Sequence, residues 1–282
     1  MRVINMNKCC ICIPVMNVDI YIPKITTNAH TIGRQFTDYR IVFFYDLSHD
    51  GTLNLIHDAQ RDSQDKIDIL CNPQPQGKVP KTHHLAHARN SMIKHIRKNY
   101  SDFEYFIMMD ADEVCTHPPN LELFQRCMRR KDWDCLTFNK AFYYDLWALS
   151  MNHIPVSMWH FEQPNAYQIY IDGINYLIET CKPGELIPVL SAFNGFGIYR
   201  TKKFINSSYD GKLRLDLVPE YLLKKNIQTA GEVMNFHWAP NEMSQDCEHR
   251  AFHMYARYND GAEICICPEI LFPDDPEFMD LE

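Results

Sequence analysis

The first 115 residues alternate between short, strongly apolar runs and longer segments whose apolar positions recur with helical spacing. Short apolar runs bounded by turn residues predict buried strands, and longer periodic segments predict amphipathic helices. The predicted strands are residues 9–15, 40–45, 66–70 and 105–109, and the predicted helices are residues 19–36, 53–61 and 85–99. This alternation predicts an α/β fold with a parallel sheet and helices on both of its faces.

The second half of the chain is less regular. It predicts strands at 135–138, 192–199 and 263–267 and a helix at 248–258. Residues 155–175 are rich in aromatic and polar side chains, and we expect loops or short ribbons there. We find no repeat and no low-complexity linker, so a single domain is the simpler prediction.

The composition is that of an ordinary globular protein, with 46% hydrophobic and 23% charged residues. The formal net charge of −8 argues against a general nucleic-acid binder, because such proteins usually present a dominant basic surface. No stretch of the sequence approaches the roughly 20 consecutive apolar residues of a membrane span. We therefore expect no membrane span, which indicates a cytoplasmic enzyme or a chain whose anchor has been removed.

Eleven cysteines raise the question of disulfides or a zinc site. An odd number cannot pair fully within one chain, and the pairs Cys10/Cys12 and Cys265/Cys267 are more closely spaced than zinc ligands usually are. We therefore expect buried, reduced thiols that pack as small apolar groups, which is typical of a reducing compartment.

Polar residues follow each predicted strand of the first half. In parallel sheets, ligands bind beyond the carboxyl ends of the strands. The residues at those four ends are Asn17, Asp46, Asn72 and Asp110. The sequence therefore predicts a nucleotide pocket along this edge of the sheet.

Asp110 and Asp112 come directly after the apolar run at 105–109. Side chains two positions apart in extended chain point the same way, so both carboxylates can face one hard divalent cation. Such a cation would neutralise phosphates and stabilise a departing nucleotide diphosphate as a Lewis acid. A lone D-x-D is usually a solvated loop, but its position after a buried strand in an alternating α/β half favours the cation site.

The segment 245–249 (QDCEH) opens the predicted helix of the second half. Its acidic residues, Asp246 and Glu248, either favour the helix N-terminus or take part in catalysis. In the segment 191–200 (SAFNGFGIYR), Gly195 would let a ligand approach the backbone closely or would mark a bulge in a strand.

Together these features resemble the GT-A glycosyltransferases. The resemblance rests on CICIPVMN, YDLSHDGT, HARNSMI and MMDADE in the first half and on the QDCEH helix, its following glycine and a last strand in the second. It implies a Rossmann-like, mostly parallel central sheet flanked by helices. It also implies one domain over residues 1–282, with a nucleotide-sugar-binding half (1–115), an irregular acceptor-binding half (116–272) and an acidic tail (273–282).

The resemblance implies a role for each candidate residue. Asp112 would ligate Mn²⁺ or Mg²⁺, Asp110 would contact the metal or the ribose, and Arg89 would reach the diphosphate or hold the loop. The histidines at 83, 84 and 87 are interpreted as a polar rim near the diphosphate rather than a zinc site. The residues that would line the nucleoside are Pro14, Asn17, Asp46 and Asn72.

The second-half candidates receive roles in the same way. An inverting enzyme needs a carboxylate that takes the proton of the acceptor hydroxyl. Glu248 is the candidate base, with Asp246 behind it. Many enzymes of this fold carry a Glu-Asp pair here, whereas this chain has Glu248-His249, so His249 would ligate the metal or bind phosphate. The candidate acceptor residues are Trp147, Trp159, Asn194, Gly195 and Trp238.

Among GT-A enzymes, the pairing of FNGFGIYR with CEHRAF resembles glycosyltransferases of large DNA viruses, in particular chlorovirus enzymes that glycosylate the capsid protein. That resemblance implies a UDP-sugar donor, with UDP-xylose as the specific candidate, and a glycan or glycoprotein acceptor such as a viral capsid glycan in the host cytoplasm. Two alternatives remain. A sugar nucleotidyltransferase would require a glycine-rich loop where this chain has PVMNVDIYIPK, and a lectin-like module would bind glycans through the aromatic second half.

Overall fold

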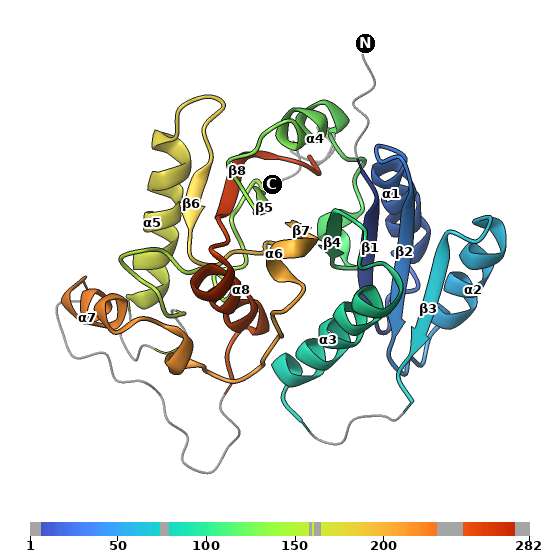
Figure 1. Cartoon of the computed structure of the whole chain (residues 1–282), viewed down its shortest axis with the longest axis horizontal. Coiled ribbons are helices and arrows are strands. Elements are labelled where there is room, and N and C mark those ends of the chain that lie inside the picture. The colour runs from blue at the N-terminus through green and yellow to red at the C-terminus, as the bar shows by residue number, and fades with distance from the viewer. Residues whose placement is uncertain (1–6, 74–78, 158–159, 161–164, 230–244, 274–282) are drawn as a thin grey trace.

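The computed structural model describes residues 7–73, 79–157, 160, 165–229 and 245–273, and these residues form one continuous sheet covered by helices (Figure 1). Over the described residues the strand order is β3-β2-β1-β4-β7-β5-β8-β6. The strands are β1 (Cys9–Val15), β2 (Tyr39–Tyr45), β3 (Ile67–Cys71), β4 (Tyr105–Met109), β5 (Cys135–Asn139), β6 (Ile187–Val189), β7 (Phe196–Arg200) and β8 (Ile264–Ile270).

The helices lie between these strands along the chain. They are α1 (Ile22–Gly33), α2 (Thr52–Asp62), α3 (Lys81–Asn99), α4 (Leu121–Met128), α5 (Ala166–Thr180), α6 (Thr201–Phe204), α7 (Glu220–Thr229) and α8 (Glu248–Asp260), with short 3-10 turns at Glu113–Cys115 and Leu215–Leu217. The seven strands and helices predicted in the first half are all present, with ends within a few residues of the predicted ones.

Most of the sheet is parallel. Strand β1 pairs in parallel with β2 and β4, β2 with β3, and β5 with β8. Strand β7 runs antiparallel to both of its neighbours, β4 and β5, so these two run in the same direction. The carboxyl ends of β1, β2, β3, β4, β5 and β8 therefore all meet at one edge of the sheet.

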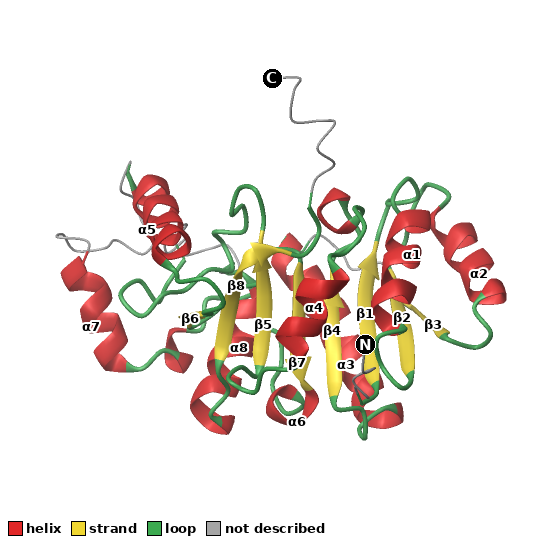
Figure 2. Ribbon diagram, turned by 90° about the horizontal axis from the view of Figure 1, so that it is seen from above, coloured by secondary structure: helices red, strands yellow, loops and turns green. Residues whose placement is uncertain are grey.

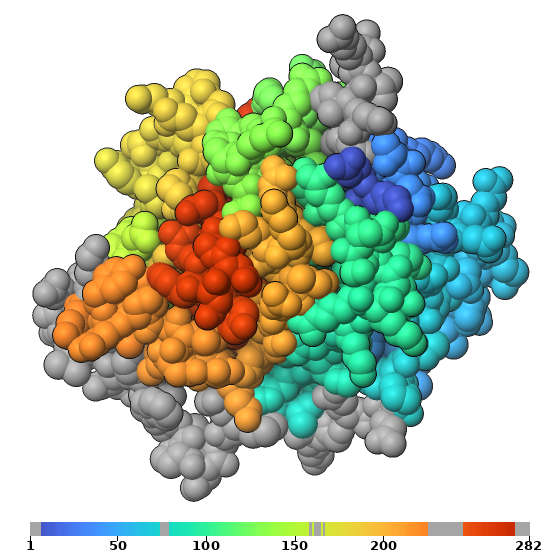
Figure 3. Space-filling model, in the orientation of Figure 1, coloured from blue at the N-terminus to red at the C-terminus, as the bar shows by residue number. Residues whose placement is uncertain are grey.

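Alternation along β1 explains the two layers of helices (Figure 2). Ile11 and Ile13 belong to the apolar core beneath α1, α2 and α4, whereas Cys10 and Cys12 belong to the core beneath α3 and α8. Both sets are fully buried, because a central strand contributes alternate side chains to opposite faces. Figure 3 shows α8 (red), the region of α6 (orange) and α3 (teal) on one surface, where α8 contacts each of the other two helices.

The prediction of an α/β fold with a mostly parallel central sheet between helices is confirmed. The prediction of loops or ribbons at 155–175 is wrong in part, because α5 begins at Ala166. Tyr170 and Ile174, four residues apart, are both buried, and this helical spacing outweighs the local polar content. Helices α4 and α7 and strand β6 are further elements that the sequence pattern did not predict.

All eleven cysteines lie in described residues and are free thiols, and most are buried, as expected. Within the same described ranges, every helix is too short or too polar to traverse a lipid bilayer.

Candidate active site

The loops after β1, β2 and β4 and the start of α3 enclose a pocket of about 550 Å³, a size that suits a small-molecule ligand. The lining divides by chemistry into two groups. The apolar lining includes Pro14, Val15, Val18, Phe44 and Leu85. The charged or ionisable lining consists of Asp46, Lys81, His84, Arg89, Asp110 and Asp112.

The acidic pair stands at the tip of β4, as predicted. The main-chain N–H of Asp110 donates to the carbonyl of Gly195 at 2.9 Å, which ties this tip to the segment before β7. Asp112 caps the following 3-10 turn by accepting from the N–H of Val114 at 3.2 Å. Burial, and then the neighbouring Asp110 charge, raise the pKa of Asp112 to about 6. Two carboxylates that burial and mutual repulsion disfavour in their charged form suit a bound cation.

The two aspartates fit a small divalent cation of the Mg²⁺ or Mn²⁺ type. Over the described residues there is no group of three or more His, Cys, Asp or Glu side chains that could hold a metal. His249 is therefore not gathered with Asp110 and Asp112 into a three-residue site. Mg²⁺ commonly binds through one or two carboxylates together with substrate phosphates and water, so two carboxylates beside an anion pocket are a sufficient protein contribution.

Arg89 connects two predicted site residues. Its guanidinium forms an ion pair with Asp110 at 2.8 Å and a second, close ion pair with Glu248, and it lies 5.0 Å from the ring centre of Phe193. The side chain is only 2% exposed, so both ion pairs are shielded from bulk water. Burial raises the pKa of Asp110, and Arg89 is the strongest influence that lowers it.

Glu248 and His249 are the first residues of α8, and both are buried. The His249 ring stacks on Phe193, with 3.8 Å between ring centres, and its Nε2 lies 3.7 Å from Glu248 Oε1. Burial, then the positive charge of Arg89, hold the pKa of His249 well below its usual value. His249 is therefore a neutral ring beside the carboxylate of Glu248.

Asp246 has a different environment. Its carboxylate pairs with Arg250 at 2.8 Å and with His160 Nε2 at 3.2 Å, and it accepts from the N–H of Cys247. Arg250 is itself buried and donates to main-chain carbonyls of the 147–149 segment. The partners of Asp246 hold the start of α8 in place, whereas Glu248 is linked through Arg89 to the acidic pair.

The residues expected to line the nucleoside are only partly brought together. Pro14 and Asp46 line the pocket. Asn72 donates to Asp46 Oδ1 at 3.0 Å and so lies behind it. Asn17 is exposed and accepts from the N–H of His49 at 2.7 Å, which holds the loop after β1 against the loop after β2. Lys81 and His84 also line the pocket, in keeping with the expected polar rim.

Of the expected acceptor residues, Trp159 and Trp238 lie outside the described residues. Trp147 is partly buried and packs against the apolar core. Asn194 and Gly195 form a turn with positive φ angles of 56° and 83° beside the acidic pair. A side chain at position 195 would meet the Tyr144 hydroxyl at 2.7 Å, so the space over this glycine is occupied by a protein side chain.

Tyr144 and Asp145 are the site residues that were not among the predicted ones. Asp145 accepts from the N–H of Asn194 at 3.3 Å, and its charge helps to raise the pKa of Asp110. Both residues follow β5, whose carboxyl end lies at the same edge as that of β4. Extending the strand-end rule from the first half to β5 would have found them.

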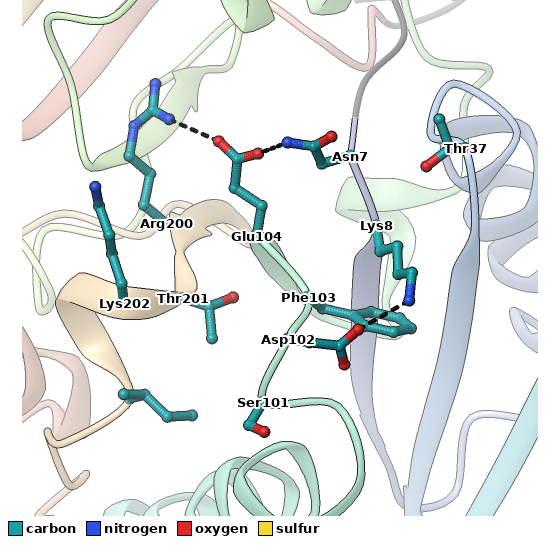
Figure 4. Close-up of a pocket in the computed structure, with 11 residues that line it drawn as sticks. Asn7, Lys8, Thr37, Ser101, Asp102, Phe103, Glu104, Arg200, Thr201 and Lys202 are labelled. Atoms are coloured by element: carbon teal, nitrogen blue, oxygen red, sulfur yellow. Dashed lines mark hydrogen bonds and ion pairs between the residues drawn. The ribbon is translucent and has the colours of Figure 1, made fainter.

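A second cavity, of about 530 Å³, lies at the opposite edge of the sheet, around the residues that precede β1 and β4 (Figure 4). Its charges largely neutralise one another, since Lys8 pairs with Asp102 at 2.8 Å and Arg200 with Glu104 at 3.4 Å. The pocket beside Asp110 and Asp112, at the carboxyl edge of the sheet, is therefore the candidate active site.

Comparison with known protein families identifies the first part of the chain. A family model described as Glycosyl transferase family 2 matches residues 10–184, which include the strands that border the pocket and the acidic pair. No curated protein sequence matches the chain.

Several solved structures are similar in fold. Residues 1–349 of Staphylococcus aureus TarS share 14% identity (TM-score 0.49, 94% of this chain and 60% of that chain). Mannosyltransferase PcManGT from Pyrobaculum calidifontis, in complex with GDP-Man and Mn²⁺, shares 11% identity (TM-score 0.45, 94% of this chain and 58% of that chain). Glucosyl-3-phosphoglycerate synthase from Mycobacterium tuberculosis, with Mn²⁺, UDP and glucosyl-3-phosphoglycerate, shares 8% identity (TM-score 0.40, 70% of this chain and 58% of that chain). The chain spans about three fifths of the length of these three solved chains.

Proposed function

Because the chain belongs to glycosyl transferase family 2, we propose that it transfers a sugar from a nucleotide diphosphate donor to a glycan acceptor in a reaction that depends on Mn²⁺ or Mg²⁺. The observation that carries this proposal is the composition of the pocket at the carboxyl edge of the sheet. Apolar side chains suited to a nucleoside line the same pocket as the two carboxylates of the acidic pair and three basic side chains. This combination suits an apolar base, a diphosphate and a divalent cation together.

In the proposed reaction, Asp110 and Asp112 hold the cation, which supplies Lewis-acid stabilisation to the leaving diphosphate. Lys81 and His84 face the same pocket and bind the diphosphate from the side of α3. Pro14 and Asp46 contact the nucleoside. Asn17 and Asn72 support this part of the site through the hydrogen bonds that order its loops.

Glu248 is the proposed base of an inverting transfer. Its carboxylate takes the proton of the acceptor hydroxyl while the acceptor oxygen bonds to the anomeric carbon and the bond from that carbon to the phosphate oxygen breaks. Glu248 forms an ion pair with Arg89, which also pairs with Asp110, so the proposed base is linked to the acidic pair. Asp246, which is held by Arg250 and His160, supports the first turn of α8.

The finer identity of the substrates is proposed from the resemblance to chlorovirus enzymes. It supports a UDP-sugar, with UDP-xylose as the first donor to test, and a viral capsid glycan as the acceptor in the host cytoplasm.

A screen of nucleotide sugars tests the proposed function. The donors are UDP-xylose, UDP-glucose, UDP-GlcNAc and GDP-mannose, each with MnCl₂ or with EDTA, and the readout is release of UDP or GDP with and without added glycans. We expect metal-dependent release from one donor, increased by the matching acceptor. Binding of glycans without any nucleotide release would instead support a lectin-like module, and formation of a nucleotide sugar from a sugar phosphate and UTP would support a nucleotidyltransferase.

A further inference from the structure

Tyr144 lies at the tip of the acidic strand, although it is far from that strand in the sequence. Its side chain is 47% exposed, but its hydroxyl end lies against the buried Gly195. A methyl group added to this glycine would come within 2.7 Å of the Tyr144 oxygen and of Val114 Cγ1. The carbonyl of Gly195 in turn accepts from the N–H of Asp110. The Tyr144 hydroxyl is therefore part of the surface around the acidic pair.

This hydroxyl has no hydrogen-bond partner among the described residues. A tyrosine hydroxyl keeps its proton at neutral pH and can therefore donate a hydrogen bond. The structure thus presents a hydrogen-bond donor beside the acidic pair that no described residue accepts from.

Hydrogen bonds of Asp145 and Asn194 join the segment after β5 to the turn before β7. The Asp145 carboxylate accepts from the N–H of Ala148 at 3.1 Å and from the N–H of Asn194 at 3.3 Å. The Asn194 side chain accepts from the N–H of Asp145 at 3.3 Å and donates to the carbonyl of Phe138 at 3.0 Å. Asn194 keeps a φ of 56°, a conformation that costs free energy in residues other than glycine. These reciprocal bonds offset that cost and fix the turn that faces Tyr144.

The strand order indicates which part of a donor reaches this hydroxyl. Strands β2 and β1 lie on one side of β4, and their carboxyl ends carry Asp46 and Pro14, whereas β7 and β5 lie on the other side. A diphosphate held at the tip of β4 with its nucleoside over β1 and β2 would direct its sugar toward the side of Tyr144. On the basis of the proposed function, we propose that the Tyr144 hydroxyl donates a hydrogen bond to the sugar of the bound donor, and that Asp145 and Asn194 are its positioning residues.

The test compares Tyr144→Phe with wild type in calorimetric titrations of UDP, UDP-xylose and UDP-GlcNAc in the presence of MnCl₂. Loss of one neutral hydrogen bond corresponds to about three- to tenfold weaker binding. We expect this loss for the UDP-sugar that wild type uses in the nucleotide-release screen, and a change of less than about twofold for UDP. The matched control is Tyr176→Phe, which makes the same chemical change at a 65% exposed tyrosine on α5 and should leave both affinities unchanged.

Two outcomes would overturn the assignment while leaving the proposed function intact. An unchanged UDP-sugar affinity in Tyr144→Phe would show that the hydroxyl does not contact the sugar. An equal loss for UDP and UDP-sugar would place its contact on the diphosphate. Failure of wild type to bind or cleave any of the nucleotides would contradict the proposed function itself, and this inference with it.

A double-mutant cycle tests the positioning role. Asp145→Asn removes the charge and one of the two acceptor contacts but keeps the size of the side chain. If Asp145 acts through Tyr144, Asp145→Asn weakens UDP-sugar binding in the wild-type background and has little further effect in the Tyr144→Phe background. Additive losses with an unchanged UDP affinity would show that Asp145 does not act through this hydroxyl.

Discussion

Arg89 is a buried cation that contacts two carboxylates from distant parts of the chain, Asp110 and Glu248. A charge that is 2% exposed is tolerated only because both partners neutralise it. The consequence for the site is that the acidic tip of β4 and the first turn of α8 are linked electrostatically through Arg89. All three residues are candidates from the sequence, but their contact could not be predicted, because it depends on how α8 packs across the sheet.

Replacing Asp112 separates cation binding from folding. Asp112→Asn keeps the shape of the side chain and its capping oxygen but removes a carboxylate whose charged form burial disfavours. At pH 7 and without metal, we expect the variant to be at least as stable as wild type in urea unfolding. Its Mn²⁺-dependent binding of UDP should fall by about a hundredfold or more in calorimetry.

The control for this variant is Glu113→Gln, which removes the neighbouring, exposed carboxylate. It should bind UDP and Mn²⁺ as wild type does. Full retention of metal-dependent binding in Asp112→Asn would contradict the assignment of the cation to this strand tip.

Replacing Glu248 tests the proposed base. Glu248→Gln retains an oxygen that can accept from Arg89 but cannot take a proton at neutral pH. We expect donor affinity close to that of wild type and transfer at least about a hundredfold slower, the usual scale of lost base catalysis. Near-normal transfer in steady-state assays would point to Asp246 or to a retaining mechanism.

The residues of the site that could be predicted are those that follow predicted strands. Asp110, Asp112 and Asp46 come from such positions and line the pocket, and Pro14 lines it from the end of the first predicted strand. The same rule applied to β5 would have found Tyr144, but not its contact with Gly195, because that contact depends on the antiparallel pairing of β7 with β4 and β5.

At the scale of elements, the turn before β7 has a stringent requirement at Gly195. Its φ is 83°, and a methyl group there would come within 2.7 Å of Tyr144 and Val114. We expect Gly195→Ala to lower the free energy of unfolding by about 2–4 kcal/mol, from backbone strain and overpacking together. Urea titration followed by circular dichroism measures this change.

Gly184 provides a matched control. Its φ is 81°, but no atom lies within 4 Å of the position that a methyl group would take. Gly184→Ala should therefore show the backbone strain alone, about 1–2 kcal/mol. Equal losses for the two variants would mean that the contact with Tyr144 is not a tight one.

His253 on helix α8 makes the free energy of unfolding depend on pH. Its ring is fully buried between Ser191 Oγ at 2.9 Å and the Tyr199 hydroxyl at 3.2 Å. Burial, then the charge of Arg250, lower the pKa of His253 from 6.5 to about 3. The folded protein therefore binds this proton less well than the unfolded chain, so the contribution to stability is complete above pH 6.5 and is lost as the pH falls toward 3.

We expect the free energy of unfolding to decrease by up to about 1.4 kcal/mol per pH unit in this window from His253. In His253→Gln the slope between about pH 6 and pH 4 should be smaller, measured by urea titrations at several pH values. His57→Gln, which replaces an exposed histidine, should keep the wild-type slope. An unchanged slope in His253→Gln would exclude this histidine as a source of acid sensitivity.

Regular periodicity explains which elements could be predicted. The strands of the first half are uniformly apolar, and β1 and β4 have the bounds that the sequence predicts. Helix α5 could not be predicted because Tyr167, Ile169 and Tyr176 are exposed aromatic or apolar residues that obscure its buried face. Short elements such as β6 are defined by pairing with β8, and pairing partners far away in sequence leave no local pattern.

At the scale of the whole molecule, β7 joins the two predicted halves of the domain. It lies between β4 of the first half and β5 of the second, so residues 1–115 and 116–272 share one sheet. We expect them to unfold together in one cooperative transition. All four tryptophans lie after residue 115, so their fluorescence reports on the second half, whereas far-ultraviolet circular dichroism reports on both.

Coincident urea transitions from these two probes would support a single cooperative unit over both halves. Two separated transitions, with circular dichroism changing where fluorescence does not, would show that residues 1–115 form an independent domain.

The late position of β7 along the chain has a consequence for biosynthesis. When the ribosome has made β4, which ends at Met109, the free edge of that strand must wait for Phe196–Arg200. At typical translation rates of about 5–20 residues per second, this interval lasts roughly 4–17 s. An uncovered apolar strand edge is a template for association between nascent chains. Slow codons or chaperone depletion during this interval should therefore lower the yield of folded protein. The free energy of unfolding of the protein that does fold should change less.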